Sequence, residues 1–281
     1  MSLNILVKDV DFIYPDGTRA LSNINYAVSQ NEFIAFIGQN GSGKTTFAKL
    51  ISGLLKPTKG TVTLFGKSIN EMKSRELATL VGYVFQNPDH QLFNTTVYDE
   101  IAFGPRNLQL DDKEIKNRVY EAAEVVGLKK ELFTESPFFL PKGLRQRVAI
   151  ASILAMRPKI IIIDEPTTGQ DWPQSIEIME FLKELFHKQH TIIMITHEME
   201  IVAEYANRTT VFHNGSILMD GDTRDVLYDY ETLSSTKIVP PFIPQSLSEF
   251  QNNLPFKPLT VNEFFNLQKL SLDIKQFKKD V

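Results

Sequence analysis

The sequence predicts an α/β fold with a mainly parallel central sheet. Strands and helices alternate in its second half, where buried strands over 160–164 and 191–196 flank a predicted helix over 175–186. This order is typical of a doubly wound sheet, whose strands are apolar on both faces. In the first half, the wholly apolar strand Phe33–Ile37 leads through a glycine-rich loop into a predicted helix over 45–51. Both halves therefore indicate one α/β core.

Other strand signals place smaller β elements around that core. Residues 3–14 and 20–28 mix β-branched and polar residues around a Pro-Asp-Gly turn, which predicts an antiparallel β subdomain at the N-terminus. Short strands are expected at 61–65 and 81–85. Asn214-Gly215 is a strong hairpin signal and predicts a turn within 211–219.

A helical subdomain is expected between about residues 88 and 155. Asp111 and Glu114 have the spacing of a capping box, and the helix that they start ends at Gly127. A second helix is predicted over 145–156.

The composition changes in the C-terminal part of the chain. All 14 glycines lie at or before Gly221, whereas five of the 14 prolines fall between Pro240 and Pro258. We therefore divide the chain into a main domain, 1–225, and a C-terminal extension, 226–281. A capping box formed by Thr260 and Glu263 predicts a short helix within the extension.

The overall composition excludes several classes of protein. The 281 residues carry a net charge of −4, which gives no electrostatic reason to expect nucleic acid as a partner. No cysteine is present, so disulfides, thiolate nucleophiles and cysteine zinc sites are excluded. The apolar runs are too short for a membrane helix, and polar residues near the N-terminus argue against a signal peptide.

The loop after the strand Phe33–Ile37 matches the pattern G-x-x-x-x-G-K-T. Such a loop directs backbone N–H groups and a helix N-terminus at phosphate oxygens, while its lysine reaches the β- and γ-phosphates and its threonine hydroxyl can bind Mg²⁺. A plain glycine turn before a helix is the alternative. We predict that ATP and Mg²⁺ bind here, and the candidate residues are Gly38, Asn40, Gly41, Ser42, Gly43, Lys44, Thr45 and Thr46.

Two carboxylates follow the buried strand 160–164. Asp164 and Glu165 lie at the carboxyl end of this strand, where open α/β sheets bind their ligands. We expect Asp164 to hold Mg²⁺ through water and Glu165 to polarise the water that attacks the γ-phosphate. The alternative is that the pair only caps the following turn.

From residue 3 to about 225, the order of these motifs resembles the ATP-binding-cassette (ABC) ATPases. The resemblance implies that Tyr14 stacks on adenine, that Gln86 contacts Mg²⁺ and the attacking water, and that His197 contacts the γ-phosphate. It also places Asp171 in the D-loop. Alternatively, Tyr14 is an ordinary strand aromatic and His197 a structural histidine.

The segment Leu140–Leu144 departs from the family, because ABC proteins usually have Leu-Ser-Gly-Gly-Gln here. In the family this signature completes the ATP site of the opposite subunit, and Gly143 keeps one of its glycines. Pro141 has neither a hydroxyl nor an N–H, so two donors are lost, and one such donor is worth roughly 3 kcal/mol. We therefore expect an asymmetric heterodimer with a second, non-identical ABC ATPase.

Residues 84–93 and 96–105 are similar to the ATPases of energy-coupling factor (ECF) importers of vitamins and transition-metal ions. The resemblance implies a groove for a coupling helix of a transmembrane subunit, a substrate-binding membrane subunit, and a peripheral position on the cytoplasmic face of the membrane. It also implies that 226–281 contacts the sister ATPase. For residues 84–105, the alternative is an apolar loop packed within its own helical subdomain. For 226–281, the alternative is an extension folded back on its own body. Another ABC importer, or a soluble ABC ATPase that remodels ribosomes or nucleic acid, is the alternative function.

Overall fold

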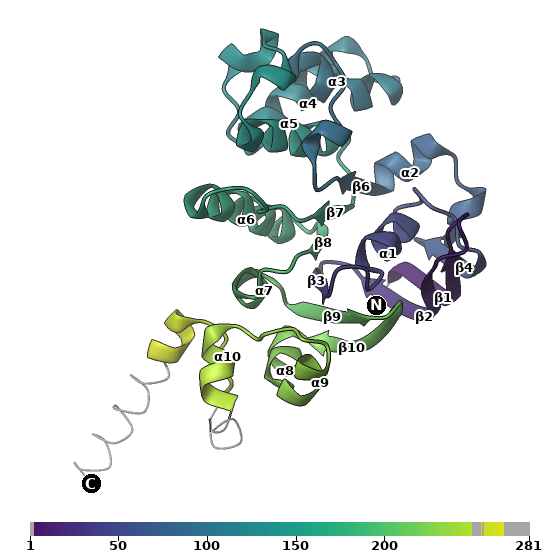
Figure 1. The fold of residues 1–281 in the computed structure, drawn as a ribbon. Helices are drawn as coiled ribbons and strands as arrows, with labels where there is room; N and C mark the ends of the chain where they lie inside the picture. The colour runs from purple at the N-terminus through teal and green to yellow at the C-terminus, as the bar shows by residue number, and fades with distance from the viewer. Residues whose placement is uncertain (1–2, 249–253, 255, 267–281) are drawn as a thin grey trace.

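The structure, a computed structural model, describes residues 3–248, 254 and 256–266. Its centre is a six-stranded sheet in the order β10-β9-β3-β8-β7-β6, which is parallel except for the β9–β10 pair (Figure 1). The strands are β3 (Phe33–Gly38), β6 (Val81–Val84), β7 (Ile160–Asp164), β8 (Thr191–Ile195), β9 (Arg208–His213) and β10 (Ser216–Asp222). The predicted parallel sheet is thus confirmed.

The apolar strands serve two hydrophobic cores at once. Successive side chains of a strand point to opposite faces, so β3 sends Phe36 to one core and Phe33 to the other. Ile162 and Ile163 of β7 divide in the same way. An uninterrupted apolar run, rather than an alternating one, is therefore what this sheet requires.

A second, antiparallel sheet in the order β2-β1-β4-β5 covers one face. Helix α1 lies between the two sheets, and its Phe47 packs on rings from both, namely Tyr26 of β2 and Phe36 of β3. The elements of this part are β1 (Leu3–Ile13), β2 (Arg19–Ser29), α1 (Lys44–Ile51), β4 (Lys59–Leu64), β5 (Lys67–Ser68) and α2 (Ser74–Leu80). The expected N-terminal antiparallel subdomain is confirmed.

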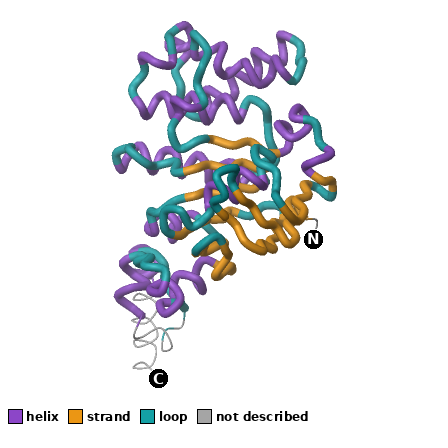
Figure 2. Tube along the Cα trace, turned by 45° about the vertical axis from the view of Figure 1, so that its right-hand side comes forward, coloured by secondary structure: helices purple, strands orange, loops and turns teal. Residues whose placement is uncertain are grey.

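Helices α3 (Val97–Asn107), α4 (Asp112–Val125) and α5 (Lys142–Leu154) form a separate group at one end of the molecule (Figure 2). Asp111 caps α4 by accepting from the Glu114 N–H at 2.9 Å. The expected reciprocal bond is missing, because the Glu114 carboxylate pairs with Arg118 and Arg157 instead. Helix α5 also starts three residues earlier than predicted.

Helices α6 (Trp172–His187) and α7 (Met199–Tyr205) pack on the other face of the central sheet. The chain then continues through α8 (Thr223–Tyr228), α9 (Tyr230–Ser235), α10 (Phe242–Leu247) and a helix over 261–266, at the end opposite to α3–α5. Thr260 accepts from the Glu263 N–H at 3.2 Å, so the predicted cap is present. Leu267 and Leu270, which we also assign to this helix from the sequence, lie outside the described residues.

The described part of the extension folds against its own domain. Arg224 pairs with Glu263 at 2.8 Å and the Phe242 N–H donates to Glu200, whereas the Tyr228 hydroxyl donates to Pro258 O at 2.8 Å within the extension itself. Within the described ranges, no helix has the length and hydropathy needed to cross a membrane.

Candidate active site

The glycine-rich loop between β3 and α1 has a backbone that only glycine suits at two positions. Gly38 has φ +148°, and a Cβ there would collide with the carbonyl oxygen of Phe212. Gly43 has φ +105°, and its Cβ would lie 2.8 Å from Leu21 Cδ2. The loop is therefore held in its curled form by β9 on one side and β2 on the other.

Lys44 lies inside this loop. Its Nζ donates to Gly38 O at 2.7 Å and to Gln39 O at 2.9 Å. Burial lowers the pKa of Lys44, and the neighbouring carboxylates Glu165 and Asp164 oppose that shift. The ammonium is thus held next to the loop's N–H groups by backbone acceptors that a phosphate could replace.

Asp164 ends β7 in a buried position. It accepts a hydrogen bond from the Tyr83 hydroxyl at 3.0 Å. Burial raises the pKa of Asp164, whereas hydrogen bonds from Tyr83 and Thr45 lower it. The two hydroxyls therefore favour the charged carboxylate that a cation would need.

Glu165 and His197 form a pair at the ends of β7 and β8. The His197 Nδ1 lies 3.0 Å from Glu165 Oε1, and Thr168 donates to Glu165 Oε2 at 3.1 Å. The His197 side chain is 67% exposed but that of Glu165 only 11%. Glu165 also has φ +52°, an uncommon value for a non-glycine residue that is typical of functional sites.

Most of the predicted site residues line two adjoining cavities. The first, about 300 Å³, is lined by Tyr14, Asn40, Gly41, Ser42, Gly43, Lys44, Thr45, Thr46, Gln86, Asp164 and Glu165. The second, about 690 Å³, is lined by Gly38, Asn40, Gln86, Glu165 and His197, together with residues 237–239 of the extension. The Tyr14 hydroxyl lies 2.9 Å from Thr46 Oγ1, so the predicted adenine-stacking residue is beside α1.

Two predicted site residues lie elsewhere. Asp171 caps α6 by accepting from the Gln174 N–H at 2.9 Å, and Gly143 sits in the first turn of α5. A Cβ on Gly143 would lie 2.8 Å from Gln170 Oε1. Neither residue lines the two cavities described above, so both belong to a separate surface formed by α5 and α6.

Three residues near the site are absent from our sequence predictions. Tyr83 bonds Asp164, Thr168 bonds Glu165, and Lys237 lines the second cavity. Thr168 lies three residues after Glu165, which is a local signal that could be recognised. Tyr83 and Lys237 meet the site only through sheet pairing and chain folding, which leave no pattern in a single sequence.

The donor set suits Mg²⁺ bound together with a phosphate. No group of three or more His, Asp or Glu side chains that could cage a metal occurs in the described part of the chain. Thr45 and Asp164 supply a hydroxyl and a carboxylate, and Mg²⁺ commonly takes one or two protein ligands, with water and phosphate oxygens completing its shell.

The signature segment, Leu140–Leu144, makes its polar contacts with other parts of its own chain. Pro141 is the N-cap residue of α5 and makes no side-chain capping bond. The Lys142 Nζ donates to Thr168 O at 3.3 Å within the same chain, and Arg145 pairs with Asp89 at 2.9 Å. The segment is therefore tied to its own chain by two cations.

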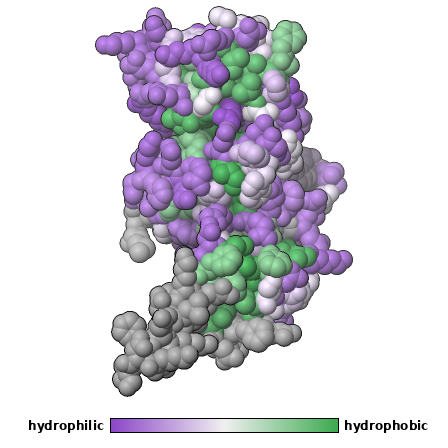
Figure 3. Space-filling view, turned by 90° about the vertical axis from the view of Figure 1, so that its left-hand side faces the viewer, coloured by the Kyte–Doolittle hydropathy of each residue, from purple (hydrophilic) through white to green (hydrophobic). Residues whose placement is uncertain are grey.

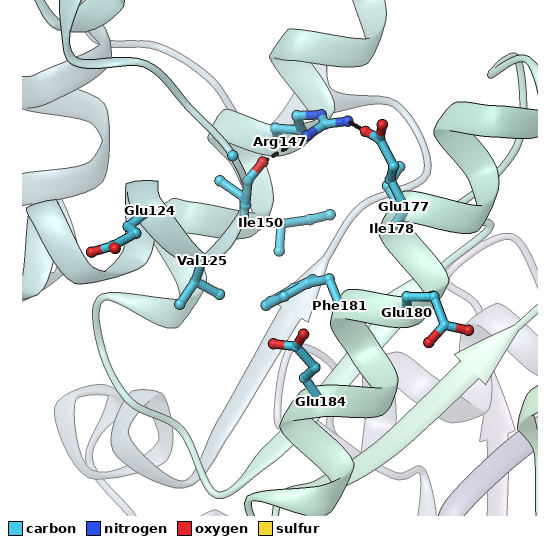
Figure 4. A pocket seen from close by; sticks show the side chains of 11 residues that line it. Glu124, Val125, Arg147, Ile150, Glu177, Ile178, Glu180, Phe181 and Glu184 are labelled. Carbon is cyan, nitrogen blue, oxygen red and sulfur yellow. Dashed lines mark hydrogen bonds and ion pairs between the residues drawn. The ribbon is translucent and has the colours of Figure 1, made fainter.

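Helix α5 is also tied to α6 farther along. Arg147 donates to Val126 O and pairs with Glu177 beside a cavity of about 420 Å³ between α4, α5 and α6 (Figure 4). Ile150 and Phe181 point into this cavity from the two helices. The signature helix is thus fixed to the α/β core at both its N-terminus and its middle.

An apolar cavity of about 400 Å³ lies between α2, α3 and the segment after β6. Phe93 and Phe103 stand edge to face at 4.7 Å on its wall, and both are exposed. The buried Glu100 carboxylate accepts from the Phe93 and Asn94 N–H groups at 2.9 and 2.7 Å. The loop that carries Phe93 is therefore rigidly held.

Comparisons with known proteins agree with this architecture. The family model described as ABC transporter matches residues 21–168. A putative ABC transporter ATP-binding protein of Caldanaerobacter subterraneus subsp. tengcongensis is 49% identical over 94% of the chain, and the chain spans 46% of that relative's length. The energy-coupling factor transporter ATP-binding protein EcfA2 of the same organism is 43% identical over 92% of this chain and 94% of its own.

Solved structures show the same fold. The structure of cbiO1 from Clostridium perfringens, described as part of the ABC transporter complex cbiONQ, has a TM-score of 0.74 and 34% identity, covering 88% of this chain and 99% of its own. The ATP-binding cassette MJ0796, in a dimer with ADP and Pi, has a TM-score of 0.72 and 28% identity, covering 78% and 99%. The chain belongs to the ABC transporter family, and within that family it is similar to the ECF ATP-binding proteins.

Proposed function

We propose that this chain binds and hydrolyses Mg²⁺-ATP to power an ECF-type importer, as one half of an asymmetric ATPase pair. The observation that carries the proposal is the convergence of Lys44, Asp164, Glu165 and His197 on two adjoining cavities. ATP supplies the phosphoryl group and Mg²⁺ neutralises developing charge on its oxygens when both are bound.

Each residue has a role that its surroundings support. Lys44 and the loop N–H groups hold the phosphates, while Thr45, Asp164 and Gln86 hold Mg²⁺ directly or through water. Glu165 orients the attacking water, and His197, 3.0 Å from it, fixes the Glu165 carboxylate and contacts the γ-phosphate.

The altered signature supports a non-identical partner. A homodimer would place Pro141 in both ATP sites, although this chain's own Glu165–His197 pair is complete. Exposed aromatic side chains lie on both sides of the signature and D-loop surface, with Phe139 at 86% and Trp172 at 61% exposure. Large exposed aromatics are characteristic of protein interfaces. Asp171 and Gly143, which lie there, would face the partner's nucleotide.

The apolar cavity beside Phe93 and Phe103 supports a membrane partner. Its walls are apolar and its rim carries polar side chains such as Arg75, a combination that suits the apolar face of a short helix. We assign this cavity to a coupling helix of a transmembrane subunit. The chain would then lie peripherally on the cytoplasmic face of the membrane, together with a separate substrate-binding membrane subunit.

The C-terminal extension is a candidate contact for the sister ATPase. It exposes Val239, Phe242 and Phe265, and apolar surface is visible in the region where it lies (Figure 3). Its described contacts with its own domain leave these side chains available for a partner.

The test is co-expression with the cognate second ATPase and membrane subunit. We expect ATP turnover of the mixed pair to exceed that of this chain alone at matched subunit concentration, and Phe93→Ala with Phe103→Ala to abolish co-purification with the membrane subunit in detergent. Leu54→Ala is the control for removal of an exposed apolar side chain in the membrane-subunit assay, because Leu54 is 52% exposed and lies outside the surfaces assigned to partners. Full activity of the isolated chain would contradict the heterodimer. Stimulation by ribosomes, with no membrane partner, would favour the non-transport alternative.

A further inference from the structure

The C-terminal extension reaches the catalytic cavity of its own chain. The Gln39 side chain, within the phosphate-binding loop, donates to Thr236 O at 2.8 Å, and Thr236 is fully buried. The next residue, Lys237, lines the 690 Å³ cavity together with Glu165 and His197. A residue about 40 positions after His197 is thereby brought to the same space.

The backbone at Lys237 is unusual for a lysine. Lys237 closes α9 with φ +57°, and its N–H donates to Ser234 O at 3.0 Å, while Ile238 N–H donates to Leu233 O. Helix ends of this left-handed kind are most often occupied by glycine, because a Cβ costs about 1 kcal/mol there. The position therefore carries a side chain at a conformational cost, and this side chain borders the cavity.

The charges around the cavity favour an anion near Lys237. The titratable groups that line it are Glu165, His197 and Lys237, and Lys44 lies in the adjoining loop. Glu165 already has His197 and Thr168 as partners. Among the ion pairs of the described residues, none involves Lys237. An exposed ammonium on a flexible stem is a common phosphate binder.

We propose that Lys237 binds the terminal phosphate of ATP and so distinguishes a nucleoside triphosphate from a diphosphate. The extension of the same chain would thus supply a second cation, in addition to Lys44, at the γ-phosphate end of the site. The inference rests on the proposed binding of ATP at the glycine-rich loop. The bond from Gln39 to Thr236 O makes the position of Lys237 depend on that loop.

The test compares Lys237→Gly with Lys237→Arg in the full-length chain. Glycine suits φ +57° better than lysine, so Lys237→Gly should keep or raise the melting temperature while removing the side chain and its charge. By calorimetry with Mg²⁺ and a non-hydrolysable ATP analogue, we expect Lys237→Gly to weaken binding roughly 5- to 10-fold and to leave ADP binding unchanged. Lys237→Arg should restore most of the affinity. Lys113→Ala, at an exposed position on α4, should change the binding of neither nucleotide.

The outcomes separate this inference from the proposed function. If wild-type protein binds both nucleotides and Lys237→Gly binds both equally well, Lys237 does not contact the terminal phosphate. If Lys237→Gly weakens the triphosphate analogue and ADP by the same factor, its effect comes through the loop and the inference is also overturned. If folded wild-type protein binds neither nucleotide, the proposed function itself fails.

Discussion

The phosphate-binding region and the signature segment differ in what their polar groups contact. In the first, Lys44, Asp164 and Glu165 each have hydrogen-bond partners that hold them beside a cavity. In the second, Pro141 offers no donor and Lys142 is directed to the carbonyl of Thr168 in its own chain. Under the proposed function, the first region is the complete half of one ATP site and the second is the incomplete half of another, so the two sites would not be equivalent.

The first test removes the candidate general base, Glu165, from the complete half. Glu165→Gln should lower ATP turnover of the assembled pair on the order of 10³-fold, because a general base typically contributes 10²–10⁴. ATP binding should be preserved, since the Glu165 carboxylate has His197 and Thr168 as its partners rather than the loop N–H groups. Steady-state hydrolysis and nucleotide binding are the measurements, and Glu184→Gln on α6 is the control. Unchanged turnover would show that hydrolysis depends on residues of the partner and not on Glu165.

Repairing the incomplete half is the next test. Pro141→Ser with Lys142→Gly restores a hydroxyl and an N–H, so hydrolysis at the site that this signature serves should rise roughly 100-fold. The measurement uses assemblies in which this chain also carries Glu165→Gln, so that only the other site turns over.

Pro141→Ala with Lys142→Gly is the matched control for that repair, because it returns the N–H but no hydroxyl. We expect it to recover only part of the gain. If the serine variant gives no increase, the signature is not what limits the second site.

Tyr83→Phe tests how the complete half keeps its carboxylate charged. Loss of the 3.0 Å bond to Asp164 should weaken Mg²⁺-dependent ATP binding about 5-fold, corresponding to about 1 kcal/mol. This bond lowers the pKa of Asp164, so its removal raises that pKa. Binding should therefore be lost at a higher pH on acidification than in the wild type. Calorimetry across pH checks this, with Tyr98→Phe as control, and an unmoved acid limb would contradict it.

The smallest expected effect concerns the extension that borders the complete half. The Arg224 hydrogen bond holds the pKa of Glu263 below its ordinary value of 4.5. The stabilisation from this pair is thus present above that pH and is lost as the pH falls through the folded-state pKa. Glu263→Gln should cost about 0.5 kcal/mol at pH 7, because the pair is partly exposed, and nothing at acid pH. Urea unfolding at both pH values measures it, with Glu204→Gln, at an exposed position on α7, as control; a cost that persists in acid would refute this assignment.

Elements with local signals could be predicted from the amino-acid sequence. The glycine-rich loop, the apolar strands β3, β7 and β8, and the Asn214-Gly215 hairpin are all present where predicted. Each depends on backbone conformation or hydrophobic pattern within about ten residues, which the side chains themselves encode. The same signals predicted Lys44, Thr45, Asp164 and Glu165 as site residues, and all four line one cavity.

Contacts between residues far apart in the sequence became visible in the folded chain alone. The Tyr83 bond to Asp164 arises because β6 pairs with β7, and the Lys142 contact with Thr168 arises because α5 packs beside α6. Lys237 reaches the site through the fold of the extension. The first two contacts join residues 81 and 26 positions apart, and their energy comes from burial and strand pairing across the whole domain. A local pattern cannot specify these contacts, since the sequence around the lysine or the tyrosine carries no signal of its distant partner.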